Sequence, residues 1–284
     1  MGERRVVITG LGTLTPLGKS HQEFWENLKN GVSGADFITK FDSSKFKTQF
    51  ACEIDDYDPS AYFDRKEARK LDPFSQYALI STDEAVKDGG LNFDELNRDR
   101  IGVIWGSGIG GLKTFQDEVM KFAEGDGTPK FSPFFIPKMI IDIASGNISM
   151  RYGLRGVNYA TVSACASSAN AIAEAFNYIK WGKNDAMITG GSEASIIEAA
   201  IGGFNSMKAL SERNDDPKTA SRPFDKGRDG FVLGEGGCTL VLEELEHARA
   251  RGAKIYAEIK GSGMSADAYH LTAPDPEGKG AELV

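Results

Sequence analysis

Long apolar runs and cysteines are both scarce in this chain of 284 residues. No apolar stretch approaches the roughly 20 residues that a helix needs to cross a bilayer, so no membrane role is expected. The first ten residues lack the apolar region of a secretory signal, and they predict a strand instead. The three cysteines cannot all pair, and their spacings fit no metal motif. These absences predict a protein of the reducing cytoplasm without a metal or other cofactor.

Basic charge is also in deficit, with 33 lysines and arginines against 41 acidic residues and a net charge of −8. A general nucleic-acid-binding surface is therefore excluded. The segment Arg65–Lys70 departs from this average, because it carries four basic residues and one acid. It is either a solvated helical face or a docking site for an acidic partner.

The chain lacks repeats and low-complexity tracts, and strand and helix patterns alternate along it instead. This alternation predicts an α/β fold with a largely buried sheet. The length suits one large or two ordinary domains. The expected strands are 5–10, 101–106, 157–162, 186–190, 238–242 and 254–260. The expected helices are 22–29, 73–88, 136–152, 166–181, 194–200 and 244–251.

Cys165 lies where a β-branched run meets an alanine-rich helical run. A thiol at a helix N-terminus faces unpaired N–H groups and the positive end of the helix dipole. Both favour the thiolate, and the N–H groups can also bind an oxyanion. Position alone leaves a buried structural role as the more frequent alternative. Cys238 is predicted to be a small buried strand residue, and Cys52 has no evident role.

Gly106–Gly111 matches the G-x-G-x-x-G pattern and follows an expected strand. A dinucleotide site also requires a second strand that ends in an acidic residue about 20 positions later. The segment 125–134 does not fit that requirement. The glycines are therefore predicted to permit a tight turn and close packing.

The segment Ser221–Gly236 alternates charged residues with turn glycines. We expect its charges to form a fixed network of ion pairs that shapes a loop. Only Phe231 is predicted to lie near a pocket. The charged residues of this motif are Arg222, Asp225, Arg228, Asp229 and Glu235.

Together these motifs resemble the β-ketoacyl-[acyl carrier protein] synthases, specifically the type II elongation enzymes. The matching pieces are spread over the chain and occur in the order found in that family. They are Val6–Gly12, Gly106–Gly111, Ser132–Phe135, Tyr152–Gly156, Ala164–Ser167, Gly190–Glu193 and Ser221–Gly236.

The resemblance implies a thiolase-like layered αβαβα fold and a role in fatty-acid chain elongation. Cys165 would take an acyl group from acyl carrier protein, with its own backbone N–H contributing to an oxyanion hole. Malonyl-carrier protein would then lose carbon dioxide, and the resulting carbanion would attack the thioester. The product is a β-ketoacyl chain on the carrier. Intact relatives are homodimers.

The resemblance also assigns roles to residues away from the cysteine. Ile109 and Phe204 match positions at the acyl pocket, beside which Phe231 is placed. Three residues match a mobile gating loop beside the entrance to the family's active site: Asp267, His270 and Thr272. The docking patch for the acidic carrier protein matches five basic residues: Lys66, Arg69, Lys70, Lys130 and Lys208. His21 and His247 are expected at the surface.

One departure from the family limits the expected activity. The two histidines, the lysine and the phenylalanine loop on which condensation depends lie further along in that family. We therefore expect residues 1–252 to form the N-terminal thiolase-like half. Residues 253–284 are expected to begin a C-terminal half with its own sheet, the rest of which is largely missing. The 284-residue chain is expected to be inactive in condensation by itself.

Two other hypotheses remain open at this stage. The chain could belong to a non-catalytic member that binds carrier protein or a partner subunit, although its cysteine argues against this. It could also be a thioesterase or hydrolase that pairs Cys165 with His270.

Overall fold

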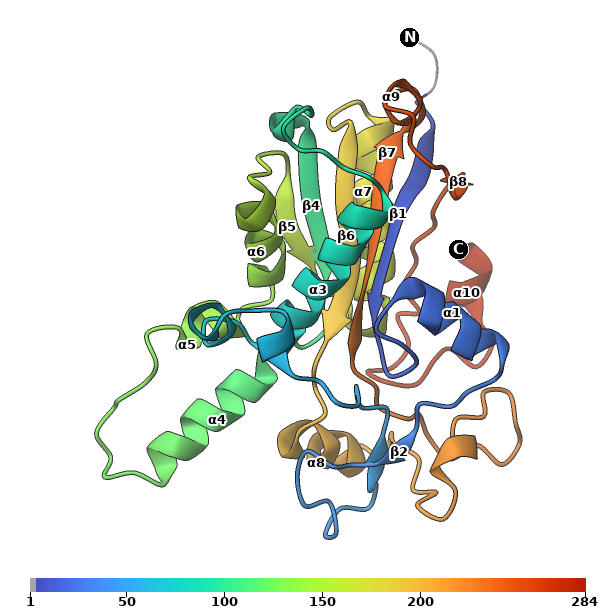
Figure 1. Cartoon of the computed structure of the whole chain (residues 1–284). Coiled ribbons are helices and arrows are strands. Elements are labelled where there is room, and N and C mark those ends of the chain that lie inside the picture. Colours follow the sequence, from blue (N-terminus) through green and yellow to red (C-terminus); the bar gives the residue numbers. More distant parts are fainter. Residues whose placement is uncertain (1–3) are drawn as a thin grey trace.

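A computed structural model describes residues 4–284 and places a six-stranded mixed sheet at the centre of the molecule (Figure 1). The strand order is β5-β4-β6-β7-β1-β8, in which β5, β4 and β6 are parallel and the remaining neighbours are antiparallel. The strands are β1 (Val6–Leu14), β4 (Ile101–Gly106), β5 (Asn158–Thr161), β6 (Ala186–Glu193), β7 (Gly236–Glu244) and β8 (Ala257–Ile259). A separate small sheet pairs β2 (Asp36–Phe37) with β3 (Phe50–Ala51).

Helices cover both faces of the central sheet. The helices α3 (Pro73–Asp88) and α6 (Ile143–Tyr152) pack on one face, and α7 (Ser167–Lys180) packs on the other. The strand β4 illustrates the alternation that this requires, because Trp105 belongs to the core under α3 and Ile104 to the core under α7. The predicted α/β fold with a buried sheet is confirmed.

Local signals set the bounds of the well-predicted helices. α1 (His21–Lys29) begins after Ser20, whose side chain accepts a hydrogen bond from the N–H of Glu23. α3 spans the predicted residues, with Asp72 as its N-cap and Gly89 as its C-cap. The predicted helices 166–181 and 244–251 correspond to α7 and to α9 (Leu245–Ala250).

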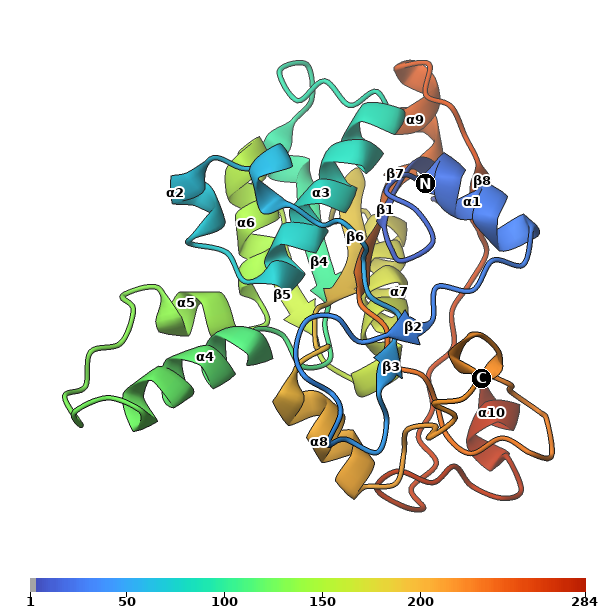
Figure 2. The same cartoon turned by 60° about the horizontal axis from the view of Figure 1, so that its bottom comes forward.

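The arm between β4 and β5 differs from the prediction. Residues 136–152 form two helices, α5 (Phe135–Met139) and α6, because the backbone is extended at Ile140. A further helix, α4 (Leu112–Ala123), was not predicted. Figure 2 shows α4 and α5 reaching away from the sheet. α8 covers Glu198–Ser206 and so begins later than expected.

The expectation of a second sheet beginning near residue 254 is wrong. β8 pairs with Val6–Ile8 of β1 and forms an edge of the central sheet. The backbone reaches this edge directly from α9, since the N–H of Tyr256 donates to the carbonyl of Ile8. After β8 the chain runs through exposed residues to the short helix α10 (Lys279–Leu283). The domain boundary at 252/253 stays a prediction.

Three polar residues are placed differently from their predictions. Cys238 lies in β7 as expected, but its side chain is exposed on the sheet face opposite α3. His21 and His247 are mostly buried, with side chains 15% and 25% exposed. Each imidazole contacts a carboxylate, Glu84 for His21 and Glu243 for His247. A hydrogen-bonding partner makes the burial of each polar ring tolerable.

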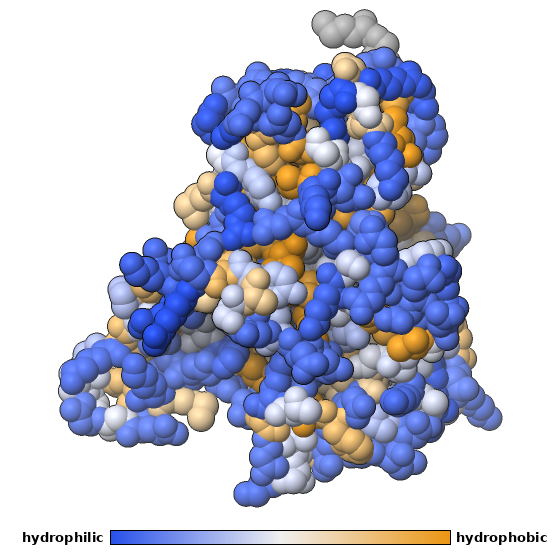
Figure 3. Space-filling model, viewed as in Figure 1, coloured by the Kyte–Doolittle hydropathy of each residue, from blue (hydrophilic) through white to orange (hydrophobic). Residues whose placement is uncertain are grey.

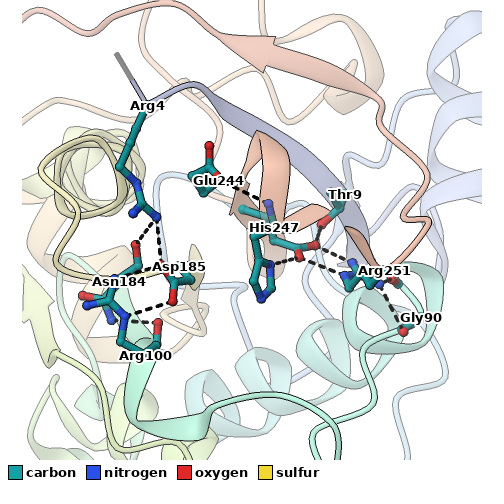
Figure 4. Close-up of polar contacts among 11 residues, drawn as sticks. Arg4, Thr9, Gly90, Arg100, Asn184, Asp185, Glu244, His247 and Arg251 are labelled. Atoms are coloured by element: carbon teal, nitrogen blue, oxygen red, sulfur yellow. Dashed lines mark hydrogen bonds and ion pairs between the residues drawn. The ribbon is translucent and has the colours of Figure 1, made fainter. Parts of the chain in front are cut away.

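The fully buried Glu243 and the half-buried Asp185 anchor polar clusters at the end of the sheet opposite the motifs of the cysteine region (Figure 4). Glu243 contacts Thr9, His247 and Arg251, while Asp185 contacts Arg4 and Arg100. On the face seen in Figure 3 the surface is mostly hydrophilic, with apolar atoms gathered where α3 meets the sheet. Across residues 4–284, no helix is long and apolar enough to span a membrane.

Candidate active site around Cys165

The candidate site lies at the carboxyl ends of the parallel strands, which Figure 2 brings forward. Gly106, the last residue of β4, is aligned with Thr161 of β5 and with Gly191 of β6. Loops that leave this edge of an α/β sheet commonly form ligand sites, because adjacent strand ends bring separate segments together. Here those loops carry Cys165 after β5 and Ile109 after β4.

Cys165 is exposed at the centre of a tight turn, the 3₁₀ helix η3 (Ala164–Ala166). The preceding residue, Ala164, has a φ of +50°, a left-handed backbone conformation that residues other than glycine rarely adopt. Ser167 holds the turn, since its hydroxyl donates to the carbonyl of Ala164 (2.7 Å) and accepts from the N–H of Ser163 (2.9 Å). Asn170 donates to the hydroxyl of Ser163 at 2.6 Å. The backbone that presents the thiol is therefore held by hydrogen bonds on both sides.

Two glycines allow the start of α7 to lie directly against the sheet. A β-carbon at Gly106 would come within 2.4 Å of the backbone nitrogen of Ser168, and one at Gly191 within 2.7 Å of the Ser168 side chain. The thiol consequently sits just before the N-terminus of a 14-residue helix. Helix N–H groups and the helix dipole favour negative charge at that position.

The glycine-rich loop after β4 binds a side chain of the protein itself. The carboxylate of Glu193 accepts hydrogen bonds from the N–H groups of Gly108 (2.8 Å), Ile109 (3.0 Å) and Gly110 (3.0 Å), and from the hydroxyl of Ser107 (3.2 Å). These amides are therefore occupied and do not form a phosphate cradle. The prediction of a tight turn with close packing is confirmed, and the structure agrees with rejecting the dinucleotide hypothesis.

The three residues assigned to the acyl pocket differ in their surroundings. Phe204 and Phe231 contact each other edge to face, with ring centroids 5.3 Å apart. Backbone hydrogen bonds between Ala209–Ser211 and Phe231 hold this pair together. Ile109 is half-buried in the glycine-rich loop. Their role at an acyl pocket stays a prediction.

The charges of the Ser221–Gly236 motif do not form the expected internal network. Glu235 is buried and pairs with Lys40, while Asp229 accepts from the hydroxyl of Ser211 and lies near Arg213. The remaining members bond locally: Arg222 donates to Thr219, and Arg228 donates to the carbonyl of Asp225. The motif is thus held by contacts with other segments of the chain. The sequence of the motif alone does not predict these contacts.

The five basic residues assigned to docking are all exposed. Three of them lie on or directly after the short helix α2 (Arg65–Ala68). The ammonium nitrogen of Lys70 lies 5.8 Å from the centroid of the Phe134 ring. Two surface hollows adjoin the set. Arg69 helps to line one of about 390 Å³, and Lys208 helps to line another of about 360 Å³. Their part in docking a partner stays a prediction.

The expected gating loop lies in the exposed segment after β8. Asp267 accepts a hydrogen bond from the N–H of Asp275, and the Nδ1 of His270 accepts from the N–H groups of Thr272 and Ala273. These contacts are local. Among the hydrogen bonds of residues 4–284, none joins a histidine to Cys165.

Sequence reasoning assigned no role to several residues that the geometry now brings to the site. Glu193 was quoted within a motif, but its partners are 83 to 86 positions away in the chain. Ser167 and Asn170 could have been found from their spacing around Cys165, because serine and asparagine commonly bond nearby backbone groups.

Curated proteins provide close matches to the chain. A 3-oxoacyl-[acyl-carrier-protein] synthase 2 of Staphylococcus aureus is 50% identical over 277 residues, which are 98% of this chain and 66% of that protein. Enzymes of the same name from Synechocystis and Coxiella burnetii are 49% and 50% identical, covering 98% and 99% of this chain and 67% of each relative. The chain thus spans about two thirds of the length of these relatives.

Solved structures are also similar to this chain. A β-ketoacyl synthase from Burkholderia phymatum has a TM-score of 0.88 and 36% identity, covering 99% of this chain and 69% of the other. An ishigamide ketosynthase/chain length factor has a TM-score of 0.90 and 31% identity, covering 100% and 69%. The thiolase-like fold is therefore confirmed. The family model for the β-ketoacyl synthase N-terminal domain matches residues 3–248, and the chain belongs to that family.

Proposed function

We propose that Cys165 is the acyl-accepting nucleophile of a condensing enzyme that elongates fatty acids. The observation that carries this proposal is the exposed thiol on a fixed turn at the head of α7. The identity of about 50% to curated 3-oxoacyl-[acyl-carrier-protein] synthases supports it. The first substrate is an acyl thioester of acyl carrier protein.

In the first step the sulfur of Cys165 attacks the thioester carbonyl. A new carbon–sulfur bond forms, the bond to the carrier breaks, and the carrier leaves as a thiol with the proton of Cys165. The intermediate carries an oxyanion that needs hydrogen-bond donors. The neighbouring amides are engaged, since Ala166 N–H donates to the Ser163 carbonyl and Ser167 N–H to that of Ala164. We assign the N–H of Cys165 to the oxyanion hole.

In the second step malonyl-carrier protein loses carbon dioxide, and its carbanion attacks the Cys165 thioester. The thiolate leaves, and the carrier retains a β-ketoacyl chain that is longer by two carbons. Among residues 4–284, no histidine is hydrogen-bonded to Cys165 to assist this step. The condensation therefore belongs to a protein that also contains the remaining third of the relatives' length, and the 284-residue chain alone is inactive in it.

The acyl chain would occupy a pocket bounded by Ile109, Phe204 and Phe231. Ile109 follows the strand next to the cysteine turn, which favours a position close to the bound chain. The segment with Asp267, His270 and Thr272 would gate the entrance. Its lack of burial is compatible with movement.

Acyl carrier protein would dock on the exposed basic residues around α2, after α8 and between α4 and α5. In one solved relative, 30% identical to this chain, an acyl carrier protein is in complex with its ketosynthase. A local basic patch on a protein of net charge −8 can still steer an acidic partner. The docking residues are Lys66, Arg69, Lys70, Lys130 and Lys208.

We further propose a homodimer in the cytoplasm. β5 is an edge strand with one unpaired side, and edges of this kind are commonly covered by another chain. The arm formed by α4 and α5 also exposes large apolar side chains that a second copy would bury: Phe115, Val119, Met120, Phe122, Phe134 and Ile136. The three free cysteines suit a reducing compartment.

The test is intact-mass detection of an acyl adduct after incubation of the full-length protein with acyl-carrier protein. We expect one adduct, lost in Cys165→Ala, and elongation once malonyl-carrier protein is added. The 284-residue chain should give no elongated product. Failure of the full-length protein to form the adduct would favour a binding-only member, and release of free fatty acid would favour a hydrolase.

A further inference from the structure

Glu193 connects two parts of the candidate site that are far apart in sequence. It is the last residue of β6, and all four hydrogen bonds to its carboxylate come from residues 107–110 after β4. Three consecutive backbone N–H groups form an anion-binding concavity of this kind, and here a side chain supplies the anion. Charge-assisted hydrogen bonds are stronger and shorter than neutral ones, so this contact fixes the loop firmly.

The bound loop contains the residue assigned to the acyl pocket. The N–H of Ile109 donates directly to Glu193, between the bonds from Gly108 and Gly110. The loop turns at Gly110, whose φ of +73° lies in the left-handed region. Without an anion, three adjacent amides would lose their partners, and the loop would have to rearrange to satisfy them. The position of the Ile109 side chain therefore depends on Glu193.

The same loop lies against the turn that presents the nucleophile. A β-carbon at Gly108 would stand 3.2 Å from the Glu193 carboxylate and 3.3 Å from the carbonyl oxygen of Ala164. Ala164 is the left-handed residue directly before Cys165. Glu193 thus supports the wall of the acyl pocket and the backbone next to the thiol at once.

The burial of the Glu193 carboxylate also shifts its pKa. Burial raises the pKa of Glu193, and the hydrogen bonds from Ile109, Gly108, Gly110 and Ser107 partly offset that effect. Within residues 4–284, the hydrogen-bond donors to this carboxylate are the loop amides of Gly108–Gly110 and the hydroxyl of Ser107, with no lysine or arginine among them.

We propose that Glu193 is a positioning residue that fixes the 107–110 loop and thereby sets which acyl chain lengths are transferred to Cys165. This inference rests on the proposed function, in which Ile109 borders the bound chain and Cys165 accepts it. Glu193 acts through the loop and does not contact the reacting atoms.

The experiment compares full-length wild type with Glu193→Ala and Glu193→Gln. Each protein receives short-, medium- and long-chain acyl-carrier proteins, and the rate of Cys165 adduct formation is followed by intact mass. The ratio of long-chain to short-chain rates is the readout, because a general loss of stability lowers all rates together. We expect this ratio to change about tenfold in Glu193→Ala, which corresponds to losing one strong interaction.

The conservative variant provides a rescue. Glutamine keeps one acceptor oxygen but turns an N–H₂ group toward the loop amides, so its ratio should lie between those of wild type and Glu193→Ala. If the alanine protein does not fold, the shift in Glu193→Gln decides the question. Glu246→Gln removes a charge from an exposed glutamate that pairs with Arg249, and it should retain the wild-type ratio.

Two negative outcomes are distinct. If wild type forms no adduct, the proposed function fails. If wild type forms the adduct but the Glu193 variants keep its chain-length ratio within twofold, the positioning role is overturned while the nucleophile stands.

Discussion

The environment of the thiol depends as much on absent side chains as on present ones. Gly106 ends β4 and is paired with Gly191 near the end of the adjacent parallel strand β6, and both glycines face the first turn of α7. Because neither glycine has a β-carbon, the first turn of the helix that follows Cys165 packs directly against these strands, next to the loops that leave them. The hydroxyl of Thr161, from the third parallel strand, donates to the carbonyl of Ser167 at 2.7 Å and adds a further attachment.

Gly106→Ala should displace the start of α7. The added methyl would stand 2.4–2.6 Å from backbone atoms of Ser167 and Ser168, and backbone cannot yield as a flexible side chain does. Overpacking of this kind costs roughly 1–3 kcal/mol in the free energy of unfolding. We expect a lower urea midpoint together with slower acyl-adduct formation at Cys165.

The matched control is Gly203→Ala on the exposed side of α8. A β-carbon there meets nothing within 4 Å, and alanine favours a helix by about 0.5–1 kcal/mol over glycine. This variant should be as stable as wild type or slightly more stable. Equal destabilisation of both variants would contradict the close-packing argument.

At the scale of elements, the α4–α5 arm is held by few attachments. Thr114 donates from its hydroxyl (2.6 Å) and its N–H (3.1 Å) to Asp72, the fully buried N-cap of α3. Gln116 donates to Glu198 and accepts from the N–H of Ala199, so it binds the N-terminal turn of α8. α4 therefore links the basic segment before α3 with the segment that carries Phe204.

Thr114→Val should loosen this arm. Burial raises the pKa of Asp72, and the hydrogen bonds from Thr114 and Phe74 partly offset it, so loss of the hydroxyl leaves a poorly satisfied carboxyl. We expect a cost of roughly 1–3 kcal/mol. Hydrogen exchange should accelerate over 112–123 more than in the central strands. Thr114→Ser keeps the hydroxyl and should retain slow exchange; an arm that is unchanged in the valine variant would refute this anchoring.

Elements with strong local signals could be predicted from sequence, and the others could not. α3 combines an aspartate cap, a first-turn proline and a Gly-Gly end, so its bounds were predicted correctly. α4 follows Gly111 without a side-chain cap, within a motif typical of a turn. In the candidate site, the Cys165 turn has a local signature. The Glu193 contact instead arises from the pairing of β4 with β6, which no local pattern contains.

At the scale of the whole molecule, the two polar clusters around Glu243 and Asp185 join distant parts of the chain. Burial alone would raise the pKa of Glu243, but hydrogen bonds from Arg251, His247 and Thr9 outweigh it and lower the pKa to about 2. Hydrogen bonds from Arg100 and Arg4 similarly outweigh burial and lower the pKa of Asp185 to about 2. The first cluster joins β1, β7 and α9, and the second ties the N-terminal segment to the start of β6.

These shifts predict that stability falls as the solution is acidified. A carboxyl whose folded pKa lies below its unfolded value stabilises the fold above the unfolded pKa, and this contribution is lost as pH falls toward the folded pKa. For both groups the loss should occur between about pH 5 and pH 2. The buried carboxyls of Asp72 and Glu193, whose pKa values are raised, contribute with the opposite sign and moderate the loss.

Glu243→Gln tests the larger of the two clusters. At neutral pH the variant should lose roughly 3 kcal/mol, because the mostly buried Arg251 keeps its charge without its carboxylate partner. The difference from wild type in the urea midpoint should shrink as pH falls, since wild type then protonates the same group. Glu246→Gln, at an exposed ion pair on the following helix α9, should show a small difference at every pH. A Glu243→Gln difference that stayed constant down to about pH 2 would mean that this carboxylate is not the source of the acid sensitivity.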